Sequence, residues 1–229
     1  MIGIIAAMDE EINALKDLMS DVKEKTIDHI DFFQGKIDDN EIVLCKSGIG
    51  KVYATIATTT LIKNYAPTFI INIGSAGSLN LDIRVGSVVI PPIVAHHDCQ
   101  VPGWPTGFEG SKRAYVADSK LLALAESLKD EHTYFVPMVS GDSFICEKSQ
   151  TTTILENFKE AGCCEMEGAS VAQTATFFEV PFIVIRSISD VTLEDDNEVD
   201  FDAFLKVAAV NSANYCRRFI KEAHAHAMV

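Results

Sequence analysis

Two apolar runs constrain the fold of this chain more strongly than any other feature of its sequence. Phe69 to Ile73 is apolar apart from Asn72, and Phe182 to Ile185 is apolar throughout. Strands of this kind are buried on both faces, which is typical of a parallel sheet with helices on each side. Similar runs alternate with helical patterns along the chain. We therefore predict a single α/β domain over residues 1–229, with a mixed, mostly parallel central sheet flanked by helices.

Composition and charge exclude several classes of protein. The chain has 229 residues and is 48% hydrophobic, which is enough for one sizeable core. With 33 acidic and 19 basic residues the net charge is −14, which argues against nucleic acid or an anionic membrane as a partner. No apolar stretch is long enough to span a membrane. The six cysteines include no C-x-x-C pair, which favours reduced thiols and a cytoplasmic location.

Shorter patterns predict the remaining elements. Asp9 is expected to cap the first helix, and Asp38 to Asn40 forms a turn between paired strands at 30–33 and 42–45. Ser47 to Lys51 forms a loop that opens a helix ending near Tyr65. We further expect strands at 2–7, 86–91 and 135–139, helices at 121–128, 149–158 and 167–178, an irregular segment at 98–114, and an acidic loop at 194–202 before a final helix ending near residue 223.

Asp190 is the first candidate for chemistry, because it follows the strand at 182–185. In open α/β sheets, ligands bind at the carboxyl ends of the strands. Asp190 is therefore either a turn or N-cap residue, or a general acid whose pKa is raised by apolar surroundings. Arg186 lies in the same apolar context, so we expect it to meet a carboxylate or a bound anion.

Three further acids have both a structural and a functional interpretation. Glu165 and Glu167 flank Met166 between a Cys-Cys pair and an apolar helix. They either accept hydrogen bonds from a vicinal diol, or serve as a helix cap and a surface acid. Glu11 lies in the first turn of the first helix, where an acid stabilises the helix dipole whether or not it does chemistry.

Two loops and a histidine pair complete the candidates. The segment Gly74 to Gly77 predicts a tight turn, either a plain strand exit or one whose amides approach a ligand oxygen. Phe144 follows a Ser-Gly-Asp loop and either stacks on a planar base or packs in the core. For His96 and His97 beside Asp98 we prefer structural or surface roles to a metal site, because no third ligand has suitable spacing.

Taken together, these segments resemble one family along nearly the whole chain. In order, they are Gly3 to Glu11, Lys46 to Val52, Asn72 to Gly77, Val139 to Ile145, Glu165 to Glu167, and Arg186 to Asp190. The set resembles the bacterial 5'-methylthioadenosine/S-adenosylhomocysteine nucleosidases of the nucleoside phosphorylase superfamily. The resemblance implies a homodimer that hydrolyses the N-ribosidic bond of 5'-substituted adenosines and releases adenine. It implies no metal and no organic cofactor.

The resemblance also implies the catalytic roles. Cleavage passes through an oxocarbenium-like sugar, and the leaving adenine is protonated at N7. That proton is assigned to Asp190, which Ser189 positions. Activation of the attacking water is assigned to Glu11, helped by Ser75 and Arg186.

Substrate binding is assigned in the same way. Glu167 would hold the ribose hydroxyls, with Met166 on the sugar and Glu165 nearby. Phe144 would stack on adenine, while the backbone of Ile145 reads its edge. Further lining is expected from Met8, Ile49 and Phe201.

Two positions differ from related patterns. Phosphorylases of the superfamily carry an Arg, which holds phosphate, where this chain has Asn72. Water is therefore the favoured nucleophile. A phosphate-dependent phosphorylase and a non-catalytic nucleoside-binding protein stay open as alternatives. After Asp98 the chain is shorter than in the family, where a dimer partner supplies this stretch to the 5' pocket. Trp104 is the expected 5'-side contact. The preferred substrate stays open among methylthioadenosine, S-adenosylhomocysteine, 5'-deoxyadenosine and aminodeoxyfutalosine.

Overall fold

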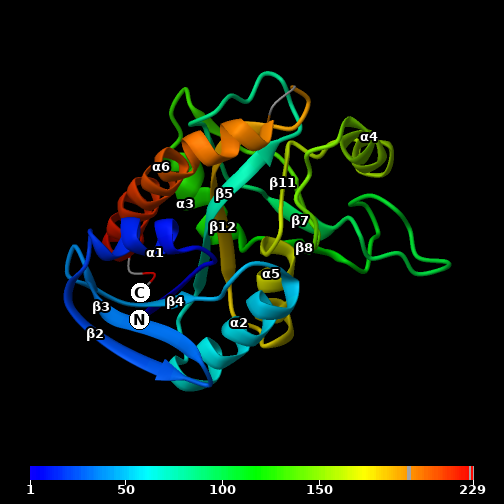
Figure 1. Cartoon of the computed structure of the whole chain (residues 1–229). Coiled ribbons are helices and arrows are strands. Elements are labelled where there is room, and N and C mark those ends of the chain that lie inside the picture. The colour runs from blue at the N-terminus through cyan, green and yellow to red at the C-terminus, as the bar shows by residue number, and fades with distance from the viewer. Residues whose placement is uncertain (195–196, 227, 229) are drawn as a thin grey trace.

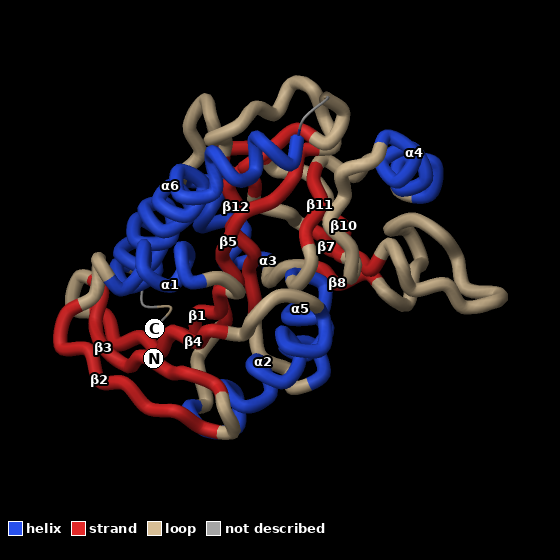
Figure 2. Tube along the Cα trace, viewed as in Figure 1, coloured by secondary structure: helices blue, strands red, loops and turns tan. Residues whose placement is uncertain are grey.

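A mixed β-sheet forms the centre of the computed structural model, which describes residues 1–194, 197–226 and 228 (Figures 1 and 2). In that part of the chain the sheet has twelve strands. The strands are β1 Ile2–Ala6, β2 Ser20–Ile27, β3 Ile30–Ile37, β4 Asn40–Lys46, β5 Ile70–Ser78, β6 Val88–Val89, β7 Ile93–His96, β8 Ala114–Val116, β9 Thr133–Tyr134, β10 Met138–Ser140, β11 Cys163–Glu165 and β12 Phe182–Val191. The helices are α1 Asp9–Lys16, α2 Lys51–Tyr65, α3 Ser119–Ser127, α4 Lys148–Asn157, α5 Gly168–Phe177 and α6 Asn197–Ala225.

The sheet runs in the order β2-β3-β4-β1-β5-β11-β10-β7-β8, and β12 pairs with both β5 and β6. β1 lies parallel to β4 and β5, and β12 lies parallel to β5. β11 is antiparallel to β5, and β2, β3 and β4 form an antiparallel meander. The sheet is therefore mixed, as predicted.

Two helical layers cover the sheet. α1, α3 and α6 lie on one face, and α2 and α5 lie together on the other (Figure 2). Alternate residues of β12 join different cores: Ile183 and Ile185 pack with α1, α3 and α6, whereas Phe182 and Val184 pack with α2 and α5. This confirms that the apolar run at 182–185 is buried on both faces. Among the described residues, no helix combines the length and apolar character needed to cross a bilayer.

The two central strands are longer than the sequence predicts. The segment Gly74 to Gly77 is not a turn but part of β5, and Asp190 does not follow β12 but lies within it. β5 and β12 pair along their whole length, so each satisfies the backbone groups of the other. This long-range pairing overrides the local turn preference of a glycine-rich segment.

Smaller corrections concern the element boundaries. The first helix begins at Asp9, with Met8 rather than Asp9 as its N-cap. β2 was not expected, since its side chains are mostly exposed and it has no apolar alternation. α6 starts at Asn197, inside the segment predicted as an acidic loop; residues 195–196 lie outside the described residues. The strand expected at 135–139 lies at 138–140, as β10. The strand expected at 86–91 is shorter and consists of β6 alone, at 88–89.

Candidate active site

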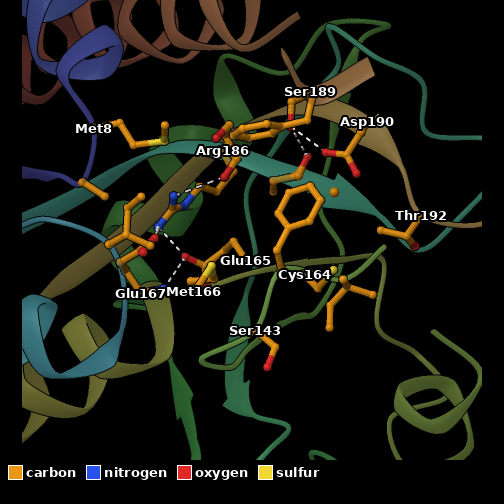
Figure 3. A pocket seen from close by; sticks show the side chains of 18 of the residues that line it. Met8, Ser143, Cys164, Glu165, Met166, Glu167, Arg186, Ser189, Asp190 and Thr192 are labelled. Carbon is orange, nitrogen blue, oxygen red and sulfur yellow. Dashed lines mark hydrogen bonds and ion pairs between the residues drawn. The ribbon is translucent and has the colours of Figure 1, made fainter. Parts of the chain in front are cut away.

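A cavity of about 350 Å³ lies where β5, β11 and β12 meet α1 and the beginning of α6 (Figure 3). Every predicted site residue except Trp104 lines it. These residues are Met8, Glu11, Ile49, Ser75, Phe144, Ile145, Glu165, Met166, Glu167, Arg186, Ser189, Asp190 and Phe201. Residues from seven separate segments thus meet at one place in the fold.

Glu11 holds the start of α1 and also lines the cavity. Its Oε2 accepts the backbone N–H groups of Ala7 and Met8, at 2.9 and 3.1 Å, and so caps α1. Its Oε1 accepts the N–H of Ser75 at 3.0 Å and lies 3.4 Å from that hydroxyl. The residue is buried and lines the cavity. A Cβ at Gly74 would lie 2.6 Å from Oε1, so this approach of β5 to Glu11 requires glycine.

Arg186 is a fully buried cation surrounded by acceptors. Its Nη2 lies 2.5 Å from Glu165 Oε2, 2.6 Å from Asn72 Oδ1 and 3.6 Å from Glu167 Oε2, and its Nη1 donates to the Ser75 carbonyl at 3.2 Å. Burial opposes the charge, but the neighbouring carboxylates outweigh it and raise the pKa of Arg186. The expected carboxylate partner is thereby confirmed. Most of the guanidinium is already engaged within the protein.

Glu165 caps α5, and Glu167 is not a surface acid. Glu165 Oε2 accepts the N–H groups of Glu167 and Gly168 at 2.9 and 2.8 Å, and its other oxygen accepts the Ser140 hydroxyl. Glu167 is 4% exposed, and its Oε1 accepts the N–H of Gly50 at 2.8 Å. The structure therefore assigns the cap to Glu165 and directs Glu167 into the cavity.

Burial and the nearby Glu165 carboxylate raise the pKa of Glu167 to about 8. Folding then takes up a proton between pH 4.5 and 8, so this residue lowers stability as the pH rises through that window. The variant Glu167→Gln mimics the protonated form. We expect its melting temperature to be about 5 °C above that of the wild type at pH 8.5 and nearly equal to it at pH 5. Thermal unfolding at both pH values measures this; Glu131→Gln, at an exposed site, is the control, and a gap independent of pH would contradict the prediction.

Asp190 and Ser189 lie on the opposite side of the cavity from the Arg186 cluster (Figure 3). The pairing of β12 with β5 shifts register between Ile188 and Asp190, so Ser189 is an extra residue and Asp190 stands opposite Gly77. Such a bulge re-aims side chains, and here it lets two successive ones line the cavity. Both are buried, and the Ser189 hydroxyl donates to Asp190 Oδ1 at 2.8 Å.

The remaining wall is apolar. The rings of Phe144 and Phe201 meet edge to face with centroids 5.2 Å apart. Phe144 is 38% exposed, so it is a cavity wall rather than a core residue. Six further lining residues had not been named as site residues: Ala7, Ala76, Gly77, Ser143, Cys164 and Thr192. The first four lie inside the family segments but no role was assigned to them, and the last two lie outside those segments.

Trp104 does not line the cavity of its own chain. It lies in the segment between Asp98 and β8 that projects from the body of the molecule beside α4 (Figure 1), with Lys112 Nζ 5.6 Å from its ring centroid. A role for Trp104 at the 5' side therefore stays a prediction, and it would have to act on a neighbouring subunit. Across residues 1–194, 197–226 and 228, no group of three His, Cys, Asp or Glu side chains is arranged to hold a metal ion.

Comparisons with known proteins identify the family of this chain. The family model described as Phosphorylase superfamily matches residues 1–221. A 5'-methylthioadenosine/S-adenosylhomocysteine nucleosidase of Shewanella pealeana is 43% identical over 221 residues, covering 93% of this chain and 95% of the relative. The nucleosidase of Neisseria meningitidis in complex with methylthio-immucillin-A has a TM-score of 0.90 and 33% identity, over 96% of this chain and 98% of that one. The futalosine hydrolase of Helicobacter pylori has a TM-score of 0.89 and 33% identity, over 96% and 97%. The chain therefore belongs to the phosphorylase superfamily and, within it, to the 5'-methylthioadenosine/S-adenosylhomocysteine nucleosidases.

Proposed function

We propose that this protein hydrolyses the N-ribosidic bond of 5'-substituted adenosines, 5'-methylthioadenosine and S-adenosylhomocysteine among them, and releases adenine. The observation that carries the proposal is that two buried acids, Asp190 and Glu11, line one cavity. Glycoside cleavage needs such a pair, one group for the leaving base and one for the attacking water. The names of the relatives support the same reaction.

In this proposal Asp190 is the general acid. An adenine anion is a poor leaving group, so a proton delivered to N7 lowers the barrier to cleavage. The Ser189 hydroxyl holds one carboxyl oxygen of Asp190. Phe144 would stack on the base and the backbone of Ile145 would read its edge; both residues lie in the wall of the cavity.

The attacking water would lie near Glu11, with Ser75 and Arg186 beside it. Glu11 Oε1 is held by Ser75, and Glu11 lines the cavity, so a water bound beside it in the cavity would give up its proton to this carboxylate. Glu167 would accept hydrogen bonds from the ribose hydroxyls, with Met166 against the sugar and Glu165 holding Arg186 in place. Positive charge developing on the sugar is favoured by the Glu11 carboxylate in the cavity wall.

Water is favoured over phosphate by the same contacts. A phosphate dianion needs free cations or several amides. Asn72 engages Arg186 at 2.6 Å, and Glu165 and Glu167 share the same guanidinium. Glu11 at the cavity wall would repel a dianion.

We therefore expect the purified protein to release adenine from methylthioadenosine at the same rate in phosphate-free and phosphate-containing buffer. Chromatography of the products measures both adenine and the sugar, which should be the free methylthioribose. Release only with phosphate, with a sugar 1-phosphate as product, would make the protein a phosphorylase. Nucleoside binding with no release in either buffer would favour the non-catalytic alternative.

We also propose a homodimer formed through α2 and its surroundings. α2 exposes Val52 and Tyr53, 68% and 62% accessible, with Ile56 on the same helix and Ile49 in the loop just before it. Phe177 lies exposed on the neighbouring α5. Apolar patches of this kind mark interfaces. A second copy is the occupant that the family resemblance implies.

Tyr53→Glu is expected to convert the dimer to a monomer, because the interface would bury an unpaired charge. Sedimentation velocity of the wild type and the variant measures this. Val22→Glu places the same charge on an exposed hydrophobic position of β2, away from this face, and should sediment like the wild type. A Tyr53→Glu variant that stays dimeric would contradict the proposed interface.

We assign the protein to the cytoplasm on the state of its thiols. None of its cysteines forms a disulfide in the described part of the chain. Burial raises the pKa of the Cys216 thiol to about 12, which keeps it protonated and inert. Such thiols are typical of a reducing compartment.

A further inference from the structure

Three segments far apart in the sequence meet around the carboxylate of Asp98. Its two oxygens accept hydrogen bonds from Lys51 Nζ at 2.6 and 2.7 Å, and Oδ2 also accepts the backbone N–H of Asp142 at 2.9 Å. Lys51 in turn donates its backbone N–H to Asp142 Oδ1 at 2.7 Å. These three residues, here called the Lys51–Asp98–Asp142 junction, close a ring between α2, the start of the projecting 98–113 segment and the loop after β10.

The junction also replaces the missing cap of α2. Gly50, the N-cap residue, has no side chain to offer and a φ of 100°, and a Cβ there would lie 3.1 Å from Asp142 Oδ1. Asp142 therefore takes the place of a local cap and meets the positive end of the helix dipole. The side chains of Lys51 and Asp98 are only 22% and 31% exposed, so the pair is sheltered compared with an ordinary surface ion pair.

Chain neighbours of Lys51 and Asp142 line the cavity or contact a residue that lines it. Gly50, next to Lys51, donates its N–H to Glu167 Oε1 at 2.8 Å, and Ile49 before it lines the cavity. Ser143 and Phe144, which follow Asp142, line the same cavity. Asp190, by contrast, accepts the Ser189 hydroxyl, and Glu11 accepts the N–H groups of Ala7, Met8 and Ser75.

We propose that Lys51 and Asp98 are positioning residues that set the affinity of the site for its nucleoside. They hold the wall that carries Ile49 and Phe144, and through Gly50 they orient Glu167. The inference rests on the proposed function for the identity of the substrate. Because the junction supports the binding walls and not the two reacting acids, its loss should raise KM and leave kcat nearly unchanged.

Steady-state kinetics with methylthioadenosine test this in Asp98→Ala, Lys51→Met and the double variant. We expect KM to rise about tenfold in each single variant, with kcat within about twofold of the wild type. The double variant should be no worse than either single one, since both changes break the same junction. Lys51→Arg, which keeps the charge, should restore a KM near that of the wild type.

Calorimetric titration with adenine separates this inference from the proposed function. A wild type that binds adenine but releases none from the nucleosides would defeat the proposed function, while a tenfold weaker adenine affinity in Asp98→Ala would still support the junction. Asp38→Ala is the matched control, because it breaks the bidentate Asp38–Arg217 pair on the turn between β3 and β4. The proposal would be overturned if the junction variants kept the KM and adenine affinity of the wild type, or lost only kcat. It would also be overturned if the effects of the two single changes on KM added in the double variant, or if the junction variants dissociated into monomers. An equal rise of KM in Asp38→Ala would overturn it as well.

Discussion

Replacing Asp190 by Asn is expected to lower kcat for adenine release by about 10³-fold, within the range that general acid catalysis contributes. The amide has nearly the same shape as the carboxyl group and can still accept the Ser189 hydroxyl through its oxygen, a hydrogen bond of 2.8 Å in the wild type. It cannot deliver a proton to N7 as an acid. The chemistry should therefore fail while the cavity keeps its form.

Pre-steady-state and steady-state assays with methylthioadenosine measure the change in kcat, and calorimetric titration with adenine measures binding. We expect adenine affinity within a few-fold of the wild type. Asp118→Asn is a suitable control, because Asp118 caps α3 through the N–H groups of Lys120 and Leu121 and does not line the cavity. An Asp190→Asn enzyme that keeps most of its kcat would remove this residue from the role of general acid.

Glu11→Gln is expected to reduce kcat by about 10²- to 10³-fold, because an amide cannot accept the proton of the attacking water. Stability should fall too. Glu11 accepts N–H groups on both oxygens, from Ala7 and Met8 on one and from Ser75 on the other. A glutamine can replace only one of these oxygens and turns a donor toward the remaining N–H, at a cost of about 1–3 kcal/mol.

Turnover and chemical denaturation should be measured on the same preparation, so that loss of folded protein is not mistaken for loss of catalysis. Glu10→Gln supplies the matched control. It removes a neighbouring charge from the same first turn of α1, where the dipole contribution is about 0.3–1 kcal/mol, and Glu10 does not line the cavity. Its kcat should be that of the wild type. Equal kcat values for both variants would show that Glu11 does not activate water.

For the residues in both experiments, the sequence had allowed a structural role as well as a functional one. Glu11 was predicted to stabilise the dipole of the first helix, and the resemblance assigned it the activation of water. The structure shows that one oxygen caps α1 while the other reaches Ser75 in the cavity wall. From the residues alone, Glu165 and Glu167 were either both ligands of a diol, or a helix cap and a surface acid with no indication of which was which. Their hydrogen bonds in the folded chain distinguish the two residues: Glu165 accepts from Ser140 and Gly168, and Glu167 accepts from Gly50. These contacts depend on where the three donors lie in space.

The positions of strand ends were the least predictable part of the fold. Gly74 to Gly77 has the composition of a turn, yet it continues β5 because β12 supplies a partner for its backbone. The register shift at Ser189 has no local signal, since a bulge arises from the pairing of two strands that lie more than a hundred residues apart in the chain. Without that shift, Ser189 and Asp190 would point to opposite faces of the sheet.

The sequence by itself determined the class of the fold, the burial of its central strands on both faces, and the identity of most residues that line the cavity. These depend on hydrophobic periodicity and on the resemblance of ordered motifs, and both are carried by the order of residues along the chain. The tertiary structure alone decided which acid caps a helix, how the guanidinium of Arg186 is shared, and that Lys51, Asp98 and Asp142 form one junction. Such contacts join residues that are distant in sequence, so only the folded chain places their atoms within hydrogen-bonding distance.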